Sequence, residues 1–75
     1  MSEYTLDACN MLCPMPVIKT QNKVNDLSDG DLLKVTCTDP GALSDIPAWC
    51  RINGHSIVNT DEINELVIVT IRIHK

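Results

Sequence analysis

The stretch ELVIVTIRI, residues 65–73, constrains the fold of this chain more than any other part of the sequence. Every second residue of it would lie on one fully apolar face of a β-strand: Val67, Val69, Ile71 and Ile73. Such a face is stable only when another layer of secondary structure covers it. The rest of the chain therefore has to supply both the neighbouring strands and the covering layer.

Three more segments have strand patterns, and the apolar alternation is clearest in the second. YTLDA at residues 4–8 and DLLKVTCT at residues 31–38 alternate as strands. HSIVNT at residues 55–60 predicts a weaker strand, and the polar stretch NTDEIN at residues 59–64 indicates a turn. Cys37 shares a face with Leu33 and Val35, which predicts a buried and inert thiol.

Two segments have helical patterns. Residues 14–27 place Val17, Val24 and Leu27 on one apolar stripe, which Ile18 widens. In the second segment, Asp39 is predicted to be an N-cap with proline at the first helical position. Pro47 lacks an N–H, so we expect a short turn before it, with the main helix restarting near residue 45 and ending at Gly54.

The predicted element order is β-α-β-α-β-β over residues 1–75, which we interpret as a single domain. At this length, two helices and four strands favour one open sheet with both helices on one face. The expected fold class is α+β, a two-layer α/β sandwich with a four-stranded mixed sheet.

Composition and charge exclude several classes of protein. The net charge of −4 and the scattered basic residues disfavour nucleic acid as a direct partner. The longest apolar run, LVIV, is too short to cross a bilayer, and the N-terminus lacks the apolar core of a signal peptide. We therefore expect a cytoplasmic protein whose four cysteines are reduced rather than paired in a disulfide scaffold.

In CNMLCPMPVIKT, residues 9–20, a cysteine comes directly before two prolines where the first helical pattern begins. Pro14 suits the first helical position because its missing N–H would have no partner there, and Pro16 falls in the first turn. Cys13 is then at or next to the N-cap, where the positive end of the helix dipole favours a thiolate. This argument alone leaves two interpretations open, a reactive thiol and a buried structural one.

The stretches LDACNMLCPMP, GDLLKVTCTDPGALSDIPAWC and GHSIV resemble the TusA/SirA-like sulfur-carrier family, from about Leu6 to the last strand. The resemblance implies the same β-α-β-α-β-β sandwich and a sulfurtransferase that needs no cofactor. It implies that Cys13, in the C-P-x-P element, accepts a sulfane sulfur as a persulfide and relays it to another protein. Asp39 matches the family's acidic position before proline, and Cys50 matches its second cysteine.

The resemblance also implies partners, namely a cysteine desulfurase or a rhodanese as sulfur donor and a DsrE-like relay protein as acceptor. It leaves tRNA thiolation, sulfur oxidation and cofactor thiolation open as pathways. Gln21 and Asn22 stand where the tRNA branch often has a basic pair, which puts that branch in doubt. Asn10 replaces a glycine usual in the family, and asparagine also tolerates a left-handed backbone.

Several alternatives stay open on the sequence. Cys9 could resolve a modified Cys13 through a disulfide, or it could simply fill the end of a strand. Cys50 could pack in the core or lie near the Cys13 loop. A metal site that combines Cys9 and Cys13 with His55 lacks the C-x-x-C spacing of structural zinc, and no metal is expected. A regulatory or protein-binding module of the same fold is the rival to a sulfur carrier.

Overall fold

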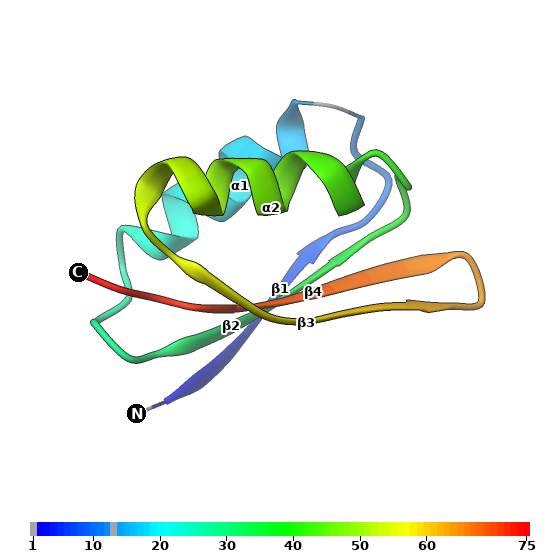
Figure 1. The fold of residues 1–75 in the computed structure, drawn as a ribbon. Coiled ribbons are helices and arrows are strands. Elements are labelled where there is room, and N and C mark those ends of the chain that lie inside the picture. The colour runs from blue at the N-terminus through cyan, green and yellow to red at the C-terminus, as the bar shows by residue number, and fades with distance from the viewer. Residues whose placement is uncertain (1, 13) are drawn as a thin grey trace.

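The computed structural model describes residues 2–12 and 14–75, and its element order is the predicted β-α-β-α-β-β. Figure 1 shows both helices on the same face of one sheet. The elements are β1 (Glu3–Ala8), α1 (Met15–Val24), β2 (Leu32–Cys37), α2 (Ala42–Asn53), β3 (Ser56–Ile63) and β4 (Leu66–Arg72). The strand order is β1-β2-β4-β3, with β1 and β2 parallel and the other pairs antiparallel. The predicted fold class, with its mixed four-stranded sheet, is confirmed.

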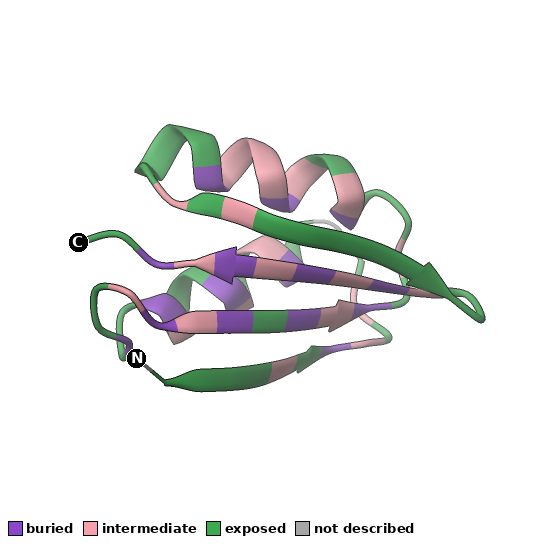
Figure 2. Ribbon diagram, turned by 60° about the horizontal axis from the view of Figure 1, so that its bottom comes forward, coloured by how far each residue is buried: buried purple, intermediate pink, exposed green. Residues whose placement is uncertain are grey.

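The core lies between the sheet and the two helices. Buried and less buried residues alternate along the central strands β2 and β4, whereas the edge strands β1 and β3 are mostly exposed (Figure 2). The predicted apolar face of the last strand is buried as expected: Val67, Val69, Ile71 and Ile73 are at most 3% exposed. Cys37 is fully buried on the neighbouring strand β2, so its predicted place in the core is confirmed.

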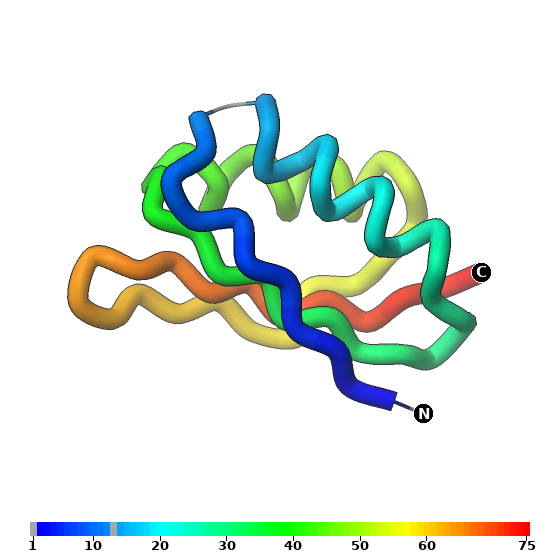
Figure 3. The backbone as a smooth tube through the Cα atoms, turned by 180° about the vertical axis from the view of Figure 1, so that it is seen from behind, coloured from blue at the N-terminus to red at the C-terminus, as the bar shows by residue number. Residues whose placement is uncertain are grey.

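Two loops meet at one end of the molecule because β1 and β2 are parallel and in register. Ala8 pairs with Cys37, so both strands end at the same level. The loop from β1 to α1 and the loop from β2 to α2 therefore leave the sheet side by side, at the end that also carries the β3–β4 hairpin (Figure 3). The chain termini lie at the opposite end.

The first helix is shorter than its apolar stripe predicted. It ends at Val24, after which the N–H groups of Asp26 and Leu27 donate to the carbonyls of Lys23 and Val24, in the tighter i to i−3 pattern. Leu27 still reaches the core from this turn. The prediction that Ile18 widens the buried stripe is wrong, because Ile18 is 42% exposed.

The second helix runs without a break from Ala42 to Asn53, with Pro47 inside it. The prediction that the helix restarts near residue 45 is therefore wrong, although its end at Gly54, which has a φ of 80°, is confirmed. Burial gives the physical reason. Ala42, Ile46 and Cys50 form one buried stripe of α2, and this stripe packs on the sheet both before and after Pro47. Packing of this stripe offsets the hydrogen bond that Pro47 cannot donate.

Replacing Pro47 with alanine should stabilise the protein. Alanine would restore the N–H that can donate to the Leu43 carbonyl and would remove the ring from the helix interior, which predicts a gain of about 1–3 kcal/mol in the free energy of unfolding. Urea denaturation of both proteins measures this difference. A lower free energy for the alanine variant would mean that the ring's own packing outweighs its backbone penalty.

The hairpin between β3 and β4 extends further than predicted. The weak strand predicted at residues 55–60 is confirmed, but the strand continues through residues 61–63, which were predicted to lie in a turn and instead pair with β4. The turn itself is Asn64 and Glu65, whose φ angles of 49° and 68° are typical of a type I′ hairpin turn. Pairing with the strongly apolar β4 imposes extended structure on a segment whose composition favours a loop.

The chain end is held against the end of α2 by two histidines. The His74 backbone N–H donates to His55 Nδ1 at 3.1 Å, and the His74 ring bonds Ser56 Oγ at 2.8 Å. These two hydrogen bonds hold His74 in place one residue before the end of the sequence. The His55 ring also lies 5.3 Å from the Trp49 ring, centroid to centroid. Because Nδ1 accepts a hydrogen bond, this arrangement requires a neutral His55.

Stability should fall as the pH drops below 6.5. Partial burial, and then the charges of His74 and Lys75, lower the pKa of His55 from its ordinary value of 6.5. As the pH falls, the unfolded chain therefore protonates His55 before the folded chain does. The stability that comes from a neutral His55 is complete above pH 6.5 and is lost as the pH falls through the pKa of His55 in the folded protein.

Urea denaturation between about pH 7.5 and about pH 5 measures this change, in a range above the titration of most carboxylates. A His55→Phe variant keeps a ring beside Trp49 but cannot titrate, so its stability should decline less over the same range. An equal decline in both proteins would contradict the assignment to His55.

Among the described residues, no helix is long and apolar enough to span a membrane.

Candidate functional site

The site is built on the loop from β1 to α1, and Asn10 sets its direction. Asn10 has a φ of 60°, so the expectation that asparagine supports a left-handed turn here is confirmed. Its backbone N–H donates to Thr38 Oγ1 at 2.8 Å, which ties the loop to the end of β2. Met11 then packs against the core, and the next residue, Leu12, is 79% exposed. The loop is thus anchored on one side and open to solvent on the other.

Helix α1 begins two residues after Cys13 in the sequence. Pro14 is the N-cap and Met15 the first helical residue, one position later than predicted, while Pro16 lies in the first turn as expected. Cys13 itself lies outside the described residues. The Met15 N–H donates to the Leu12 carbonyl at 2.9 Å, and the Val17 N–H donates to the Pro14 carbonyl at 3.1 Å.

These bonds leave the helix start with few free donors. Pro14 and Pro16 have no N–H, and those of Met15 and Val17 already have backbone partners. No side chain caps the helix. A negative charge next to this end would therefore be stabilised by the helix dipole rather than by several direct hydrogen bonds from the first turn.

Apolar side chains surround the helix start on its open side. Leu12, Met15 and Ile18 are 79%, 48% and 42% exposed, although each could bury a large apolar surface. Three exposed apolar side chains so close together in the sequence are a candidate surface for contact with another protein. Sequence reasoning missed it, because Ile18 was assigned to the core and Leu12 had no periodic pattern to place it.

The described cysteines have protonated thiols. Hydrogen bonding to Asp7, then partial burial and the Asp7 charge, raise the pKa of Cys9 above its usual value, and its Sγ lies 3.8 Å from the Thr36 carbonyl oxygen. Burial raises the pKa of Cys37 and of Cys50 to about 11. Cys50 is 1% exposed and faces the core from α2. None of these three thiols is set up as a nucleophile at neutral pH.

Asp39 helps to shape the start of the second helix. Its Oδ1 accepts a hydrogen bond from the Gly41 N–H at 3.0 Å, and its carbonyl accepts one from Ala42 at 3.0 Å. The assigned N-cap is Gly41, so the prediction that Asp39 is the N-cap is wrong by two residues, although its carboxylate does bond a backbone N–H. Asp39 directly follows Thr38, which the structure ties to Asn10.

Two contacts at the site were not foreseen. Lys19 Nζ donates to the Asp7 carbonyl at 2.7 Å and thereby links α1 to the end of β1. The Thr38 hydroxyl accepts a hydrogen bond from the Asn10 N–H, and the only signal for Thr38 in the sequence is a polar residue at the end of a predicted strand.

His55 lies beyond the far end of α2, away from the Cys9 loop. In the described part of the chain, no group of three or more ligating side chains could hold a metal ion.

Fold and site together define a small two-layer α+β protein in which a cysteine directly precedes a proline-flanked helix start. The family model for sulfurtransferase TusA matches residues 4–73, so the chain belongs to this family. The resemblance to TusA/SirA-like sulfur carriers is thereby confirmed.

Similar proteins agree with this assignment. The sulfur carrier protein TusA of Pseudomonas aeruginosa is 49% identical over 57 residues, which cover 76% of this chain and 72% of the relative. YrkI of Bacillus subtilis is 42% identical over 62 residues, which cover 81% of this chain and 83% of the relative. The crystal structure of a SirA-like protein from Desulfitobacterium hafniense superposes with a TM-score of 0.84. It covers 96% of this chain and 99% of its own and is 23% identical, so it shows the shared fold.

Proposed function

We propose that this protein carries sulfane sulfur as a persulfide on Cys13 and passes it from a donor protein to an acceptor protein. The observation that carries the proposal is the start of α1 at Met15, two residues after Cys13, behind the N-cap Pro14. The helix dipole there favours an anionic sulfur by about 0.3–1 kcal/mol at an exposed position. Membership of the sulfurtransferase TusA family supports the same chemistry.

In the loading step, the Cys13 thiolate attacks the terminal sulfur of a donor persulfide. The S–S bond of the donor breaks as a new S–S bond to Cys13 forms, so R–S–SH and Cys13–S⁻ become R–S⁻ and Cys13–S–SH. The same exchange in reverse delivers the sulfur to an acceptor thiolate. The exchange needs no oxidant or reductant, because the sulfane sulfur keeps its oxidation state throughout.

The supporting residues hold the loop and the helix start. Pro14 and Pro16 restrict the backbone where the helix begins, and Asp39 orders the neighbouring loop through the Gly41 N–H. We assign Cys50 a packing role, since its thiol is buried. Cys9 is a slow resolving thiol at best, because its raised pKa leaves little thiolate to attack Cys13.

The partners are a sulfur donor, either a cysteine desulfurase or a rhodanese, and an acceptor such as a DsrE-like relay protein. The exposed side chains of Leu12, Met15 and Ile18 support docking of a protein next to Cys13. The three described cysteines are free thiols, in keeping with a reducing, cytosolic location. In this role the protein is a stoichiometric relay as much as an enzyme.

Intact-protein mass spectrometry tests the proposal. The protein is incubated with a cysteine desulfurase plus cysteine, and separately with a rhodanese loaded from thiosulfate. We expect one added sulfur that a reducing agent removes, and the faster donor indicates the pathway. If neither donor adds sulfur, and sodium polysulfide adds none either, the carrier function is contradicted, and the family fold serves here as a binding or regulatory module.

A further inference from the structure

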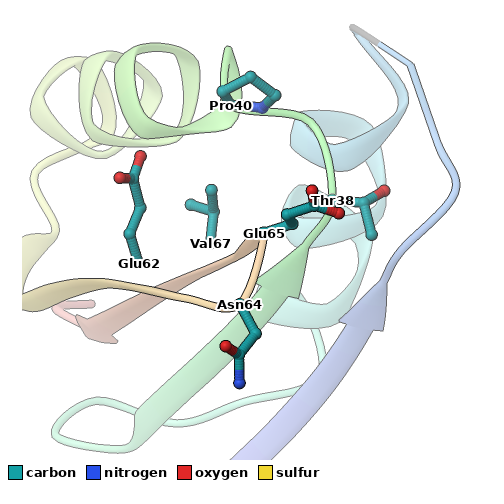
Figure 4. A pocket seen from close by; sticks show the side chains of 6 residues that line it. All are labelled: Thr38, Pro40, Glu62, Asn64, Glu65 and Val67. Atoms are coloured by element: carbon teal, nitrogen blue, oxygen red, sulfur yellow. The ribbon is translucent and has the colours of Figure 1, made fainter.

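A groove of about 540 Å³ lies between the β3–β4 hairpin and the loop that leads into α2. Val67 forms a buried apolar floor, whereas Glu62 and Glu65 are exposed carboxylates. In Figure 4, Glu62 points from β3 toward α2, and Glu65 points from the hairpin turn toward Thr38. The groove therefore combines an apolar base with two negative charges on its rim.

The groove adjoins the loop that carries Cys13. Thr38 lines it, and the hydroxyl of the same Thr38 accepts the hydrogen bond from Asn10. Thr38 is thus shared between the wall of the groove and the anchor of the β1–α1 loop. A protein segment bound in the groove would hold the rest of that protein over the loop.

The charge around the groove is of one sign. A second hollow of about 280 Å³, lined by Leu43, Thr60, Asp61 and Glu62, shares Glu62 with the first. No basic side chain lines either hollow among the residues that the structure describes. The carboxylates there are also not gathered into a set that could hold a metal ion. Separated negative charges on an open groove fit a ligand that carries several spaced positive charges.

Glu65 has a backbone conformation that is unfavourable for a residue with a side chain. Its φ of 68° is one at which glycine would be unstrained, and glycine is the preferred residue at this place in a type I′ turn. The side chain of Glu65 is therefore present in spite of a conformational penalty, which agrees with a use for its charge.

We propose that this groove binds a lysine- or arginine-bearing segment of the protein that exchanges sulfur with Cys13. The proposal rests on the sulfur-carrier function and adds the chemistry of the partner surface. The basic segment pairs with Glu62 and Glu65 while its aliphatic stems lie against the exposed Pro40 and over the base at Val67, which orients the partner for exchange. Charge pairs at an open rim act mainly on the rate of association and make it sensitive to salt.

The test compares sulfur loading of three full-length proteins: wild type, Glu62→Gln/Glu65→Gln, and the control Glu3→Gln/Asp26→Asn. The control removes the same charge from exposed positions at the opposite end of the molecule. Each is loaded by the desulfurase and by the rhodanese at low and high salt, and by sodium polysulfide, which needs no docking. We expect the groove variant to load about tenfold more slowly from protein donors at low salt, with a weaker salt dependence.

The polysulfide reaction separates the two proposals. We expect it to be equal in all three proteins, because it depends only on Cys13. Failure of polysulfide to load the wild type would contradict the carrier function itself. Normal polysulfide loading would leave the carrier function standing. The groove proposal would then be overturned if the groove and control variants loaded equally from protein donors, or if no protein donor loaded the wild type.

A Glu65→Gly variant excludes loss of folding as the cause. Glycine removes the carboxylate and relieves the backbone, so the midpoint of urea unfolding should rise while loading from protein donors slows. A variant that is more stable and loads at the wild-type rate would show that the Glu65 charge has no part in docking.

Discussion

Replacing Cys13 with serine should abolish sulfur loading by every donor. A serine hydroxyl is not ionised near neutral pH and is a far weaker nucleophile than a thiolate, so it cannot take up a sulfane sulfur. The described thiols are poor replacements for Cys13, because Cys37 and Cys50 are buried and hydrogen bonding to Asp7 raises the pKa of Cys9. Intact-protein mass spectrometry should show no added sulfur on the variant.

Cys9→Ser is the matched control, since Cys9 precedes Cys13 in the same loop. We expect it to load sulfur like the wild type. Loss of loading in Cys9→Ser but not in Cys13→Ser would move the carrier role to Cys9. A cellular function that survives Cys13→Ser would favour a binding or regulatory module instead.

Replacing Ile46 with alanine should destabilise the fold by about 2–5 kcal/mol. Ile46 is fully buried at the centre of the stripe that joins α2 to the sheet, so its truncation leaves a cavity in the core. Whole domains are stable by only about 5–15 kcal/mol, and a chain of 75 residues has a small core. This one substitution should therefore remove a large part of the free energy of unfolding.

Ile52→Ala is the control on the same helix, because Ile52 is 83% exposed. The same chemical change there should alter the free energy of unfolding by less than about 0.5 kcal/mol. Urea denaturation followed by circular dichroism compares both variants with the wild type. Equal effects at the two positions would contradict the packing of α2 on the sheet described above.

Local patterns were enough to predict the element order and the fold class. Alternation over Val67 to Ile73 identified the central strand, and the glycine at position 54 identified the end of α2. Both signals are local, because the side-chain period belongs to the strand itself and the left-handed C-cap belongs to one residue.

Predictions failed where tertiary contacts outweigh local preference. Pro47 was expected to interrupt α2, yet burial of Ile46 and Cys50 on either side of it keeps the helix intact. Residues 61–63 were expected in a turn, yet pairing with β4 draws them into a strand. Ile18 was expected in the core, but the way α1 lies on the sheet leaves this residue in solvent.

For the site, the sequence by itself determined the reactive residue we propose, because Cys13, Pro14 and Pro16 are neighbours in the chain and a helix start is a local feature. Only the tertiary structure decided what surrounds it. Thr38, Glu62 and Glu65 are far from Cys13 in sequence, and the parallel pairing of β1 with β2 and the fold of the hairpin bring their loops to one end. Side-chain periodicity carries no information about such contacts, since they depend on how separate strands align in the sheet.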